Sequence, residues 1–116
     1  MKATARSLAV LREMGYAAEV VERFIPHTKT RKDLFGVGDV LAIHPREGIL
    51  LVQCTSGANH AARVKKANAE PRLAVWLAAG GKFQVWSWRL AGKAGKRKRW
   101  TLRTEFVTPT EIVRKV

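Results

Sequence analysis

The chain has 116 residues, with 22 Lys and Arg against 9 Asp and Glu, so its formal net charge at pH 7 is +13. This length indicates a single domain, 1–116, and a hydrophobic content of 47% excludes a disordered basic tail. One cysteine excludes an internal disulfide framework and a cysteine-rich zinc site. The sequence contains neither an apolar run long enough for a membrane span nor a signal-peptide pattern, which predicts a cytoplasmic protein.

The positive charge indicates a polyanionic partner. Nucleic acid is favoured, because Lys and Arg side chains that neutralise phosphates release condensed counterions. An anionic membrane would instead require a basic amphipathic helix with bulky apolar residues opposite the charges, a pattern that the expected helices lack. We therefore expect nucleic-acid binding and no membrane contact.

Hydrophobic periodicity and turn residues predict an α/β fold, in which helices flank a central mixed β-sheet. In the first half we expect a helix over 4–14, a strand over 19–25, a loop over 27–38 and strands over 39–44 and 49–55. In the second half we expect helices over 58–70 and 72–79, strands over 82–90 and 99–107 joined by a Gly- and Lys-rich turn, and a helix-capping box at 108–111.

The most informative segment is GDVLAIHPREGILLVQCTS, which has the pattern of a β-hairpin. We take residues 46–48 as a three-residue loop, with glycine at the position that needs a left-handed backbone. In this register Asp39 faces Thr55 and Leu41 faces Gln53. Strand side chains alternate between two faces, so Asp39, Gln53 and Thr55 are predicted to meet at the open end of the hairpin.

The other face of the second strand is predicted to lie in the core, and it consists of Leu50, Val52 and Cys54. A carboxylate, an amide oxygen and a hydroxyl at the end of an otherwise apolar hairpin predict a site for a divalent cation bound by hard oxygen ligands. Structural roles also remain open for these and nearby residues. Asp39 can cap a turn, Thr55 is a common strand residue, Glu22 can form a salt bridge and Asp33 can cap a loop.

The segments GDVLAI and ILLVQCTS, with the short turn between them and the helix that follows, resemble the core of the PD-(D/E)XK nuclease superfamily. Within it, the archaeal-type and phage Holliday junction resolvases are most similar, over roughly residues 4–66. The resemblance implies a restriction-endonuclease-like fold and a homodimer that hydrolyses phosphodiesters in branched DNA with Mg²⁺ or Mn²⁺. It also suggests a phage or mobile-element origin.

The family's functional positions carry over to this chain one at a time. Asp39 takes the place of the motif aspartate, a metal ligand. Gln53 stands where the family usually has Glu or Asp, and Thr55 stands where it usually has the catalytic lysine. The backbone carbonyl of Cys54 lies where the family supplies another metal oxygen, and Glu22 is a candidate for an additional acid.

Two departures change the charge of this predicted site. Gln53 offers a neutral oxygen, so the site has one negative charge fewer than the family pattern. Thr55 supplies no positive charge for the attacking water or the scissile phosphate, for which Lys29 or Lys32 of the loop is a possible substitute. The departures leave open either a variant enzyme or a nuclease fold that has lost catalysis.

DNA contacts are predicted from basic side chains in three regions of the sequence. They are Lys29, Arg31 and Lys32 in the loop, Arg63, Lys65 and Lys66 in the helix after the motif, and Lys96, Arg97 and Lys98 in the turn between the last two strands. Four tryptophans raise the possibility of base stacking, but at least one of Trp86 and Trp88 is expected in the core or in a dimer interface.

Two alternatives to a nuclease remain. The first is a non-catalytic DNA- or RNA-binding module that retains the nuclease fold, which the residues at positions 53 and 55 favour. The second is a structural protein associated with RNA, which size and charge allow. The second gives no reason for the polar cluster on the hairpin.

Overall fold

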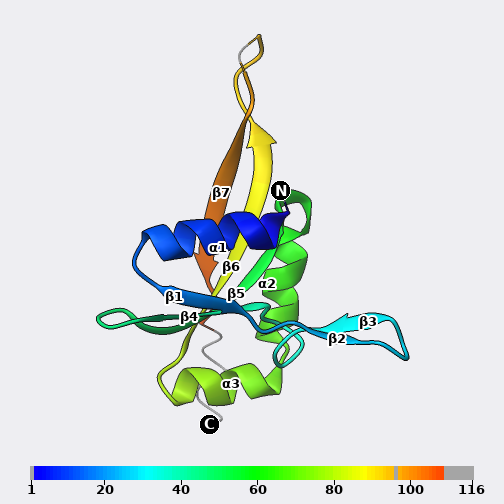
Figure 1. The fold of residues 1–116 in the computed structure, drawn as a ribbon, viewed down its shortest axis with the longest axis vertical. Helices are drawn as coiled ribbons and strands as arrows, with labels where there is room; N and C mark the ends of the chain where they lie inside the picture. The colour runs from blue at the N-terminus through cyan, green and yellow to red at the C-terminus, as the bar shows by residue number, and fades with distance from the viewer. Residues whose placement is uncertain (1, 96, 109–116) are drawn as a thin grey trace.

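Five strands form one mixed sheet with helices on both faces, as Figure 1 shows for the computed structural model, which describes residues 2–95 and 97–108. The sheet has the order β1-β4-β5-β6-β7, and β2 and β3 form a separate hairpin. Along the chain the elements are α1 (Ala3–Glu13), β1 (Ala17–Val20), β2 (Arg23–Ile25), β3 (Thr30–Lys32), β4 (Val40–His44), β5 (Gly48–Ser56), η1 (Gly57–Asn59), α2 (His60–Asn68), α3 (Pro71–Ala78), β6 (Lys82–Ala91) and β7 (Arg99–Phe106). The expected α/β class with a mixed sheet is confirmed.

One face of the sheet is covered by α1, whose Leu11 is fully buried against it. Leu50, Val52 and Cys54 of β5 lie in this cluster, as the alternation of their side chains predicted. Trp86 of β6 completes it and is 2% exposed, so this tryptophan belongs to the core.

The opposite face is covered by α2 and α3. Leu51 of β5 and Phe83 and Val85 of β6 pack there against Ala67 of α2 and Leu73 of α3. Apolar residues therefore alternate with β period on both central strands, so each strand contributes to two clusters. Within the described part of the chain, none of the helices is long and apolar enough to cross a membrane.

Two elements in the first half differ from the sequence-based expectation. The strand expected over 19–25 is interrupted at Val21 and Glu22, so that β1 joins the main sheet and β2 does not. The segment expected as a loop contains β3, which pairs with β2 in an antiparallel hairpin. The apolar content of residues 19–25 correctly predicted an extended backbone. It carried no information about which sheet β1 and β2 would each join.

The hairpin register also differs from the expectation. The loop is Pro45–Glu47, so that His44 pairs with Gly48 and Leu41 pairs with Leu51 rather than with Gln53. Gly48 does adopt the left-handed backbone predicted for it, with φ of +86°. Gly48 is the first residue of β5 rather than the last residue of the loop. The pairing of β4 with β5 is therefore shifted by two positions from the predicted register, and an even shift leaves every side chain on its predicted face.

The elements of the second half lie close to their expected positions. β6 and β7 are antiparallel, and β6 runs parallel to β5 after the α2–α3 crossover. Lys96 and positions 109–111 of the expected capping box lie outside the described residues.

A buried histidine connects α2 to the last two strands. His60 is 2% exposed; its Nδ1 lies 2.6 Å from Ser87 Oγ of β6 and its Nε2 lies 2.9 Å from Glu105 Oε1 of β7. Both ring nitrogens therefore have partners, as a buried imidazole requires. The network fixes the start of α2 relative to β6 and β7.

Close packing at Gly38 yields a prediction about stability. A Cβ at this position would overlap the side chain of Leu51, which is fully buried. Gly38→Ala is expected to lower the free energy of unfolding by about 1–3 kcal/mol through overpacking. In a Leu51→Ala background the same change should cost clearly less, because the clashing atoms are absent. Urea denaturation of the four proteins measures this coupling, and equal costs in both backgrounds would contradict it.

Candidate metal centre

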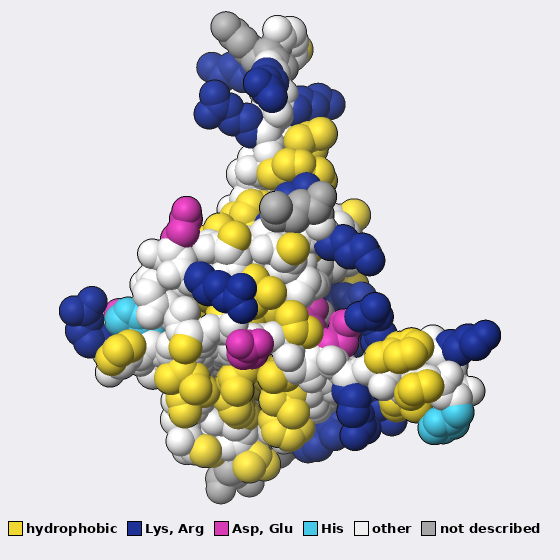
Figure 2. Space-filling model, in the orientation of Figure 1, with side chains coloured by type: hydrophobic (Ala, Val, Ile, Leu, Met, Phe, Trp, Pro, Cys, Tyr) yellow, Lys and Arg dark blue, Asp and Glu magenta, His cyan; other side chains and the backbone are white. Residues whose placement is uncertain are grey.

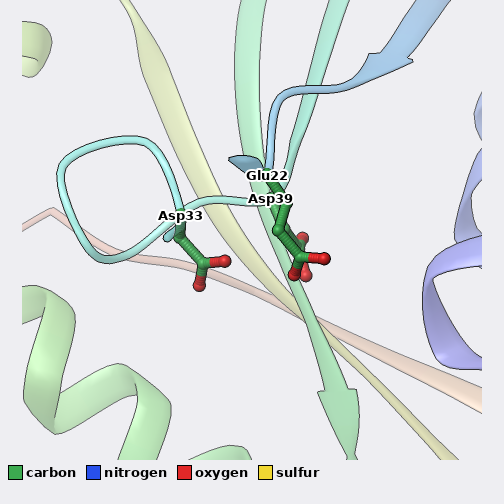
Figure 3. A group of neighbouring side chains, drawn as sticks. All are labelled: Glu22, Asp33 and Asp39. Atoms are coloured by element: carbon green, nitrogen blue, oxygen red, sulfur yellow. The ribbon is translucent and has the colours of Figure 1, made fainter. Parts of the chain in front are cut away.

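Three carboxylates from different segments converge at one edge of the sheet. Glu22 lies between β1 and β2, Asp33 directly follows β3, and Asp39 directly precedes β4. One carboxylate oxygen of each lies within 4.8 Å of the others. Figure 3 shows the side chains of Glu22 and Asp39 overlapping in this view and that of Asp33 to one side of them, with all three carboxylates directed the same way. This spacing places three hard oxygen ligands around a volume that suits a divalent cation.

Backbone hydrogen bonds produce this convergence. The N–H of Val21 donates to the carbonyl of Asp39 at 2.9 Å, which places Glu22 beside Asp39. The N–H of Leu34 donates to the carbonyl of Gly38 at 2.7 Å and closes a tight turn between Asp33 and Asp39. The acids therefore meet because the backbone pairs there, and the pairing overcomes the repulsion between their side chains.

Asp39 is the most buried of the three carboxylates, with 4% of its surface exposed. Its Oδ1 accepts a hydrogen bond of 3.0 Å from the N–H of Cys54. Burial raises the pKa of Asp39 to about 6, the Cys54 hydrogen bonds oppose the shift, and the charges of Asp33 and Glu22 add to it. A bound cation would remove this cost by favouring the ionised carboxylate.

Asp33 is influenced by both acidic and basic neighbours. Burial is the main cause that raises its pKa, followed by the charge of Glu22. A hydrogen bond from the Gln53 side chain and the charges of Lys66 and Arg63 act in the opposite direction. The charge of Asp33 is therefore influenced both by another acid of the cluster and by the basic side chains of α2.

The carboxylates lie in a pocket of about 640 Å³ whose lining includes five basic residues. They are Arg31, Lys32, Arg63, Lys66 and Arg72. Figure 2 shows acidic side chains beside Lys and Arg side chains between the body of the molecule and the β2–β3 hairpin. The pocket therefore combines anionic ligands for a cation with cationic groups for a phosphate.

The structure brings together most of the site residues predicted from the hairpin. Asp39, Gln53 and Cys54 all line the pocket, and so does Glu22. Gln53 is 4% exposed, and its Nε2 donates to the carbonyl of Cys54 at 3.5 Å. The Cys54 thiol packs in the core, and burial raises its pKa. Its backbone carbonyl is the group available for the role that the resemblance implies.

Thr55 lies elsewhere. It is buried and pairs with Ser87 of β6, further along β5, and it is not among the residues that line the pocket. The predicted convergence with Asp39 fails because the register is shifted by two positions, which brings Asp39 opposite the Val52–Gln53 step instead.

The predicted basic residues fall into three places. Arg31, Lys32, Arg63 and Lys66 line the pocket, whereas Lys29 lies in the β2–β3 turn and Lys65 is not among the lining residues. Arg97 and Lys98 lie far from the pocket at the end of the β6–β7 hairpin. Arg31 also donates to Glu22 at 2.8 Å, so Glu22 has both the salt bridge and the position near the other acids.

Sequence reasoning missed Asp33 and Arg72. The sequence interpretation gave Asp33 a capping role, although DLFGVGD has one acid on each side of a turn that contains two glycines. A turn of this length returns the chain on itself, so this spacing was the available signal. Arg72 carried no such signal, because only the packing of α3 places it at the pocket, where it pairs with Glu70 at 2.9 Å.

Comparison of the chain with protein-family models, with curated proteins and with solved structures found no match.

The raised pKa of Asp39 predicts a pH-dependent cost in the metal-free protein. The folded state holds the proton more tightly than the unfolded state, so stability is lost as pH rises from 3.8 through about 6. Asp39→Asn keeps the acceptor for Cys54 and removes the charge. It should raise the free energy of unfolding at pH 8 in EDTA by up to about 3 kcal/mol, with little effect at pH 3.5.

Urea denaturation at the two pH values measures this difference. Mn²⁺ should raise the melting temperature of the unmodified protein at pH 8 more than that of Asp39→Asn. A variant less stable than the unmodified protein at pH 8 in EDTA would contradict the assignment of Asp39 as a destabilising buried charge.

Proposed function

We propose that the protein is a Mg²⁺- or Mn²⁺-dependent endonuclease that hydrolyses phosphodiesters in branched DNA. The observation that carries the proposal is the cluster of Glu22, Asp33 and Asp39 within 4.8 Å, in a pocket whose other charged residues are all basic. Hydrolysis of a phosphodiester requires both an activated water and neutralisation of the phosphate charge. This pocket has groups for both.

The fold supports a restriction-endonuclease-like assignment. The strand–turn–strand–helix order on which the resemblance rests is present as β4, β5 and α2, and the acids gather at the start of β4. A helix, α1, and a strand, β1, precede them along the chain. The resemblance further implies a homodimer, which sedimentation equilibrium would test.

The chain's own residues divide the work by charge. The carboxylates of Glu22, Asp33 and Asp39 would hold the cation, and the carbonyl of Cys54 or Gln53 would add a neutral oxygen. When bound, Mg²⁺ or Mn²⁺ lowers the pKa of a coordinated water and polarises the phosphate. Asp33 adds a carboxylate that the hairpin pattern lacked, which compensates for the neutral side chain at position 53.

Lys66 and Arg63 would supply the positive charge that the family's catalytic lysine provides and that Thr55 lacks. Both line the pocket from α2, and the charges of both act to lower the pKa of Asp33, although burial and Glu22 have larger effects in the opposite direction. Among the described residues neither has a salt-bridge partner within 4.0 Å. We therefore assign the positive charge next to the scissile phosphate to α2. Lys29 does not line the pocket, and Lys32 lines it but is not among the charges that shift the pKa of Asp33.

Cleavage of a four-way junction tests the proposed function. A labelled junction and a matched linear duplex are incubated with Mg²⁺, Mn²⁺ or EDTA. The junction should be cut only with metal, and Asp39→Ala should slow cutting by about 100-fold or more, because a ligand of the cation is lost. Glu19→Gln, an exposed change on β1 outside the pocket, is the matched control and should cut normally.

Junction binding without cutting in either metal, unaffected by Asp39→Ala, would reject the endonuclease. It would favour a binding module that retains the fold. Preference for structured RNA over both DNA substrates would favour the RNA-associated alternative.

The assignment of Lys66 has its own test. Lys66→Met should lower kcat for junction cleavage by about 100-fold and change KM much less, since its charge matters most as negative charge develops on the phosphate. Lys65→Met removes the same charge one residue away, outside the pocket lining, and should keep kcat. Lys66→Arg should restore part of the rate. Equal losses in the Lys65 and Lys66 variants would show that α2 acts through general charge alone.

A further inference from the structure

The last two strands extend beyond the sheet as a two-stranded ribbon. β5 ends at Ser56, opposite Trp88, whereas β6 and β7 continue to pair through Leu90 and Trp100 to Ala91 and Arg99. Figure 1 shows this ribbon projecting from the body of the molecule along its longest axis. We refer to residues 89–101 as the arm.

The arm concentrates positive charge. Its 13 residues include six Lys or Arg and no Asp or Glu, against a net charge of +13 for the whole chain. Dark blue side chains surround its end in Figure 2. All described basic side chains of the arm are exposed, and none has a salt-bridge partner among the described residues. The charge of the arm is therefore not neutralised by ion pairs within the described residues.

The base of the arm is fixed to α1 at two points. Trp88 Nε1–H donates to Ser7 Oγ at 2.9 Å, and both residues are buried. The Arg6 guanidinium lies 3.7 Å from the centre of the Trp100 ring, within the range of a cation–π contact. A two-stranded ribbon is only marginally stable alone, so these contacts give the arm a defined direction.

Shape and charge together select the partner. The major groove of B-form DNA is wide enough to admit a two-stranded β-ribbon, and its walls are lined with phosphates. The major groove of A-form RNA is deep and narrow and does not admit one. A two-stranded arm with exposed Lys and Arg on both strands therefore fits the major groove of B-form DNA and does not fit that of A-form RNA.

We propose that the arm inserts into the major groove of duplex DNA next to the branch that is cut at the pocket. The choice of DNA rests on the proposed function. The arm supplies affinity by contacting phosphates on both sides of the groove, while the pocket supplies the chemistry. Because the two lie apart, binding and cutting can be measured separately.

Equilibrium binding in EDTA tests the arm without cleavage. Arg97→Gln with Lys98→Gln removes two charges from the arm. In the control, Arg46→Gln in the β4–β5 turn and Lys82→Gln at the start of β6, where Lys82 pairs with Glu47, remove two charges at the other end of β6. For a linear DNA duplex, the arm variant should bind about tenfold more weakly near 0.15 M salt. The slope of log K against log salt should fall by about 2 in magnitude, as expected for two lost phosphate contacts. The control should lose much less.

Two further measurements distinguish groove insertion from general attraction. Double-stranded RNA of equal length should bind the arm variant and the control variant alike, because its major groove excludes the ribbon. The unmodified protein should protect guanine N7, a major-groove atom, from methylation, and the arm variant should not. Equal losses on DNA and RNA, or the absence of N7 protection, would overturn the proposal.

The outcomes also separate this inference from the proposed function. If no junction is cut in any metal but the arm variant still loses DNA affinity and N7 protection, the endonuclease proposal is wrong and the proposal for the arm is supported. If the junction is cut and the arm variant binds the duplex as tightly as the control variant does, the proposal for the arm is wrong and the endonuclease proposal is supported.

Discussion

Electrostatic repulsion among three carboxylates is the constraint that the local backbone at the site has to overcome. The backbone holds Glu22, Asp33 and Asp39 together through hydrogen bonds of Val21 with Asp39 and of Leu34 with Gly38. These bonds belong to the sheet edge and to a tight turn, so the backbone positions of the three acids are set by local secondary structure. The metal-free fold therefore carries an unfavourable charge arrangement that a cation would relieve, and this is the sense in which the site is preorganised.

The distribution of the opposite charge follows from the same constraint. Arg31, Lys32, Arg63 and Lys66 surround the acids without neutralising all of them, because only Arg31 is paired with one, Glu22. The basic side chains of the pocket are mostly exposed, whereas Asp39 is buried, so under the proposed function a phosphate would meet the basic groups and a cation the acids. A second group of six Lys and Arg residues lies in the arm, apart from the pocket, where under our proposal it would attract DNA over a distance.

Much of the fold and part of the site could be predicted from the sequence, because alternation of apolar residues reports strand faces directly. The hairpin register was wrong by two positions, yet the core assignment of Leu50, Val52 and Cys54 held, since a shift by an even number preserves the face. The prediction for Thr55 depended on the register itself and failed. Asp33 had only the DLFGVGD spacing as a signal, and Lys66 comes near enough to act on its charge through the packing of α2, which no local pattern encodes.

The position of α2 also links the pocket to the arm. The helix carries Lys66 and Arg63 at the pocket, and His60 at its start is hydrogen-bonded to Ser87 of β6 and Glu105 of β7. The strands that extend into the arm are thus fixed, through one buried imidazole, to the helix that provides the basic side of the pocket. A duplex held by the arm would consequently have a fixed orientation relative to the carboxylates, and orientation of this kind lowers the entropic cost of placing one phosphodiester against them.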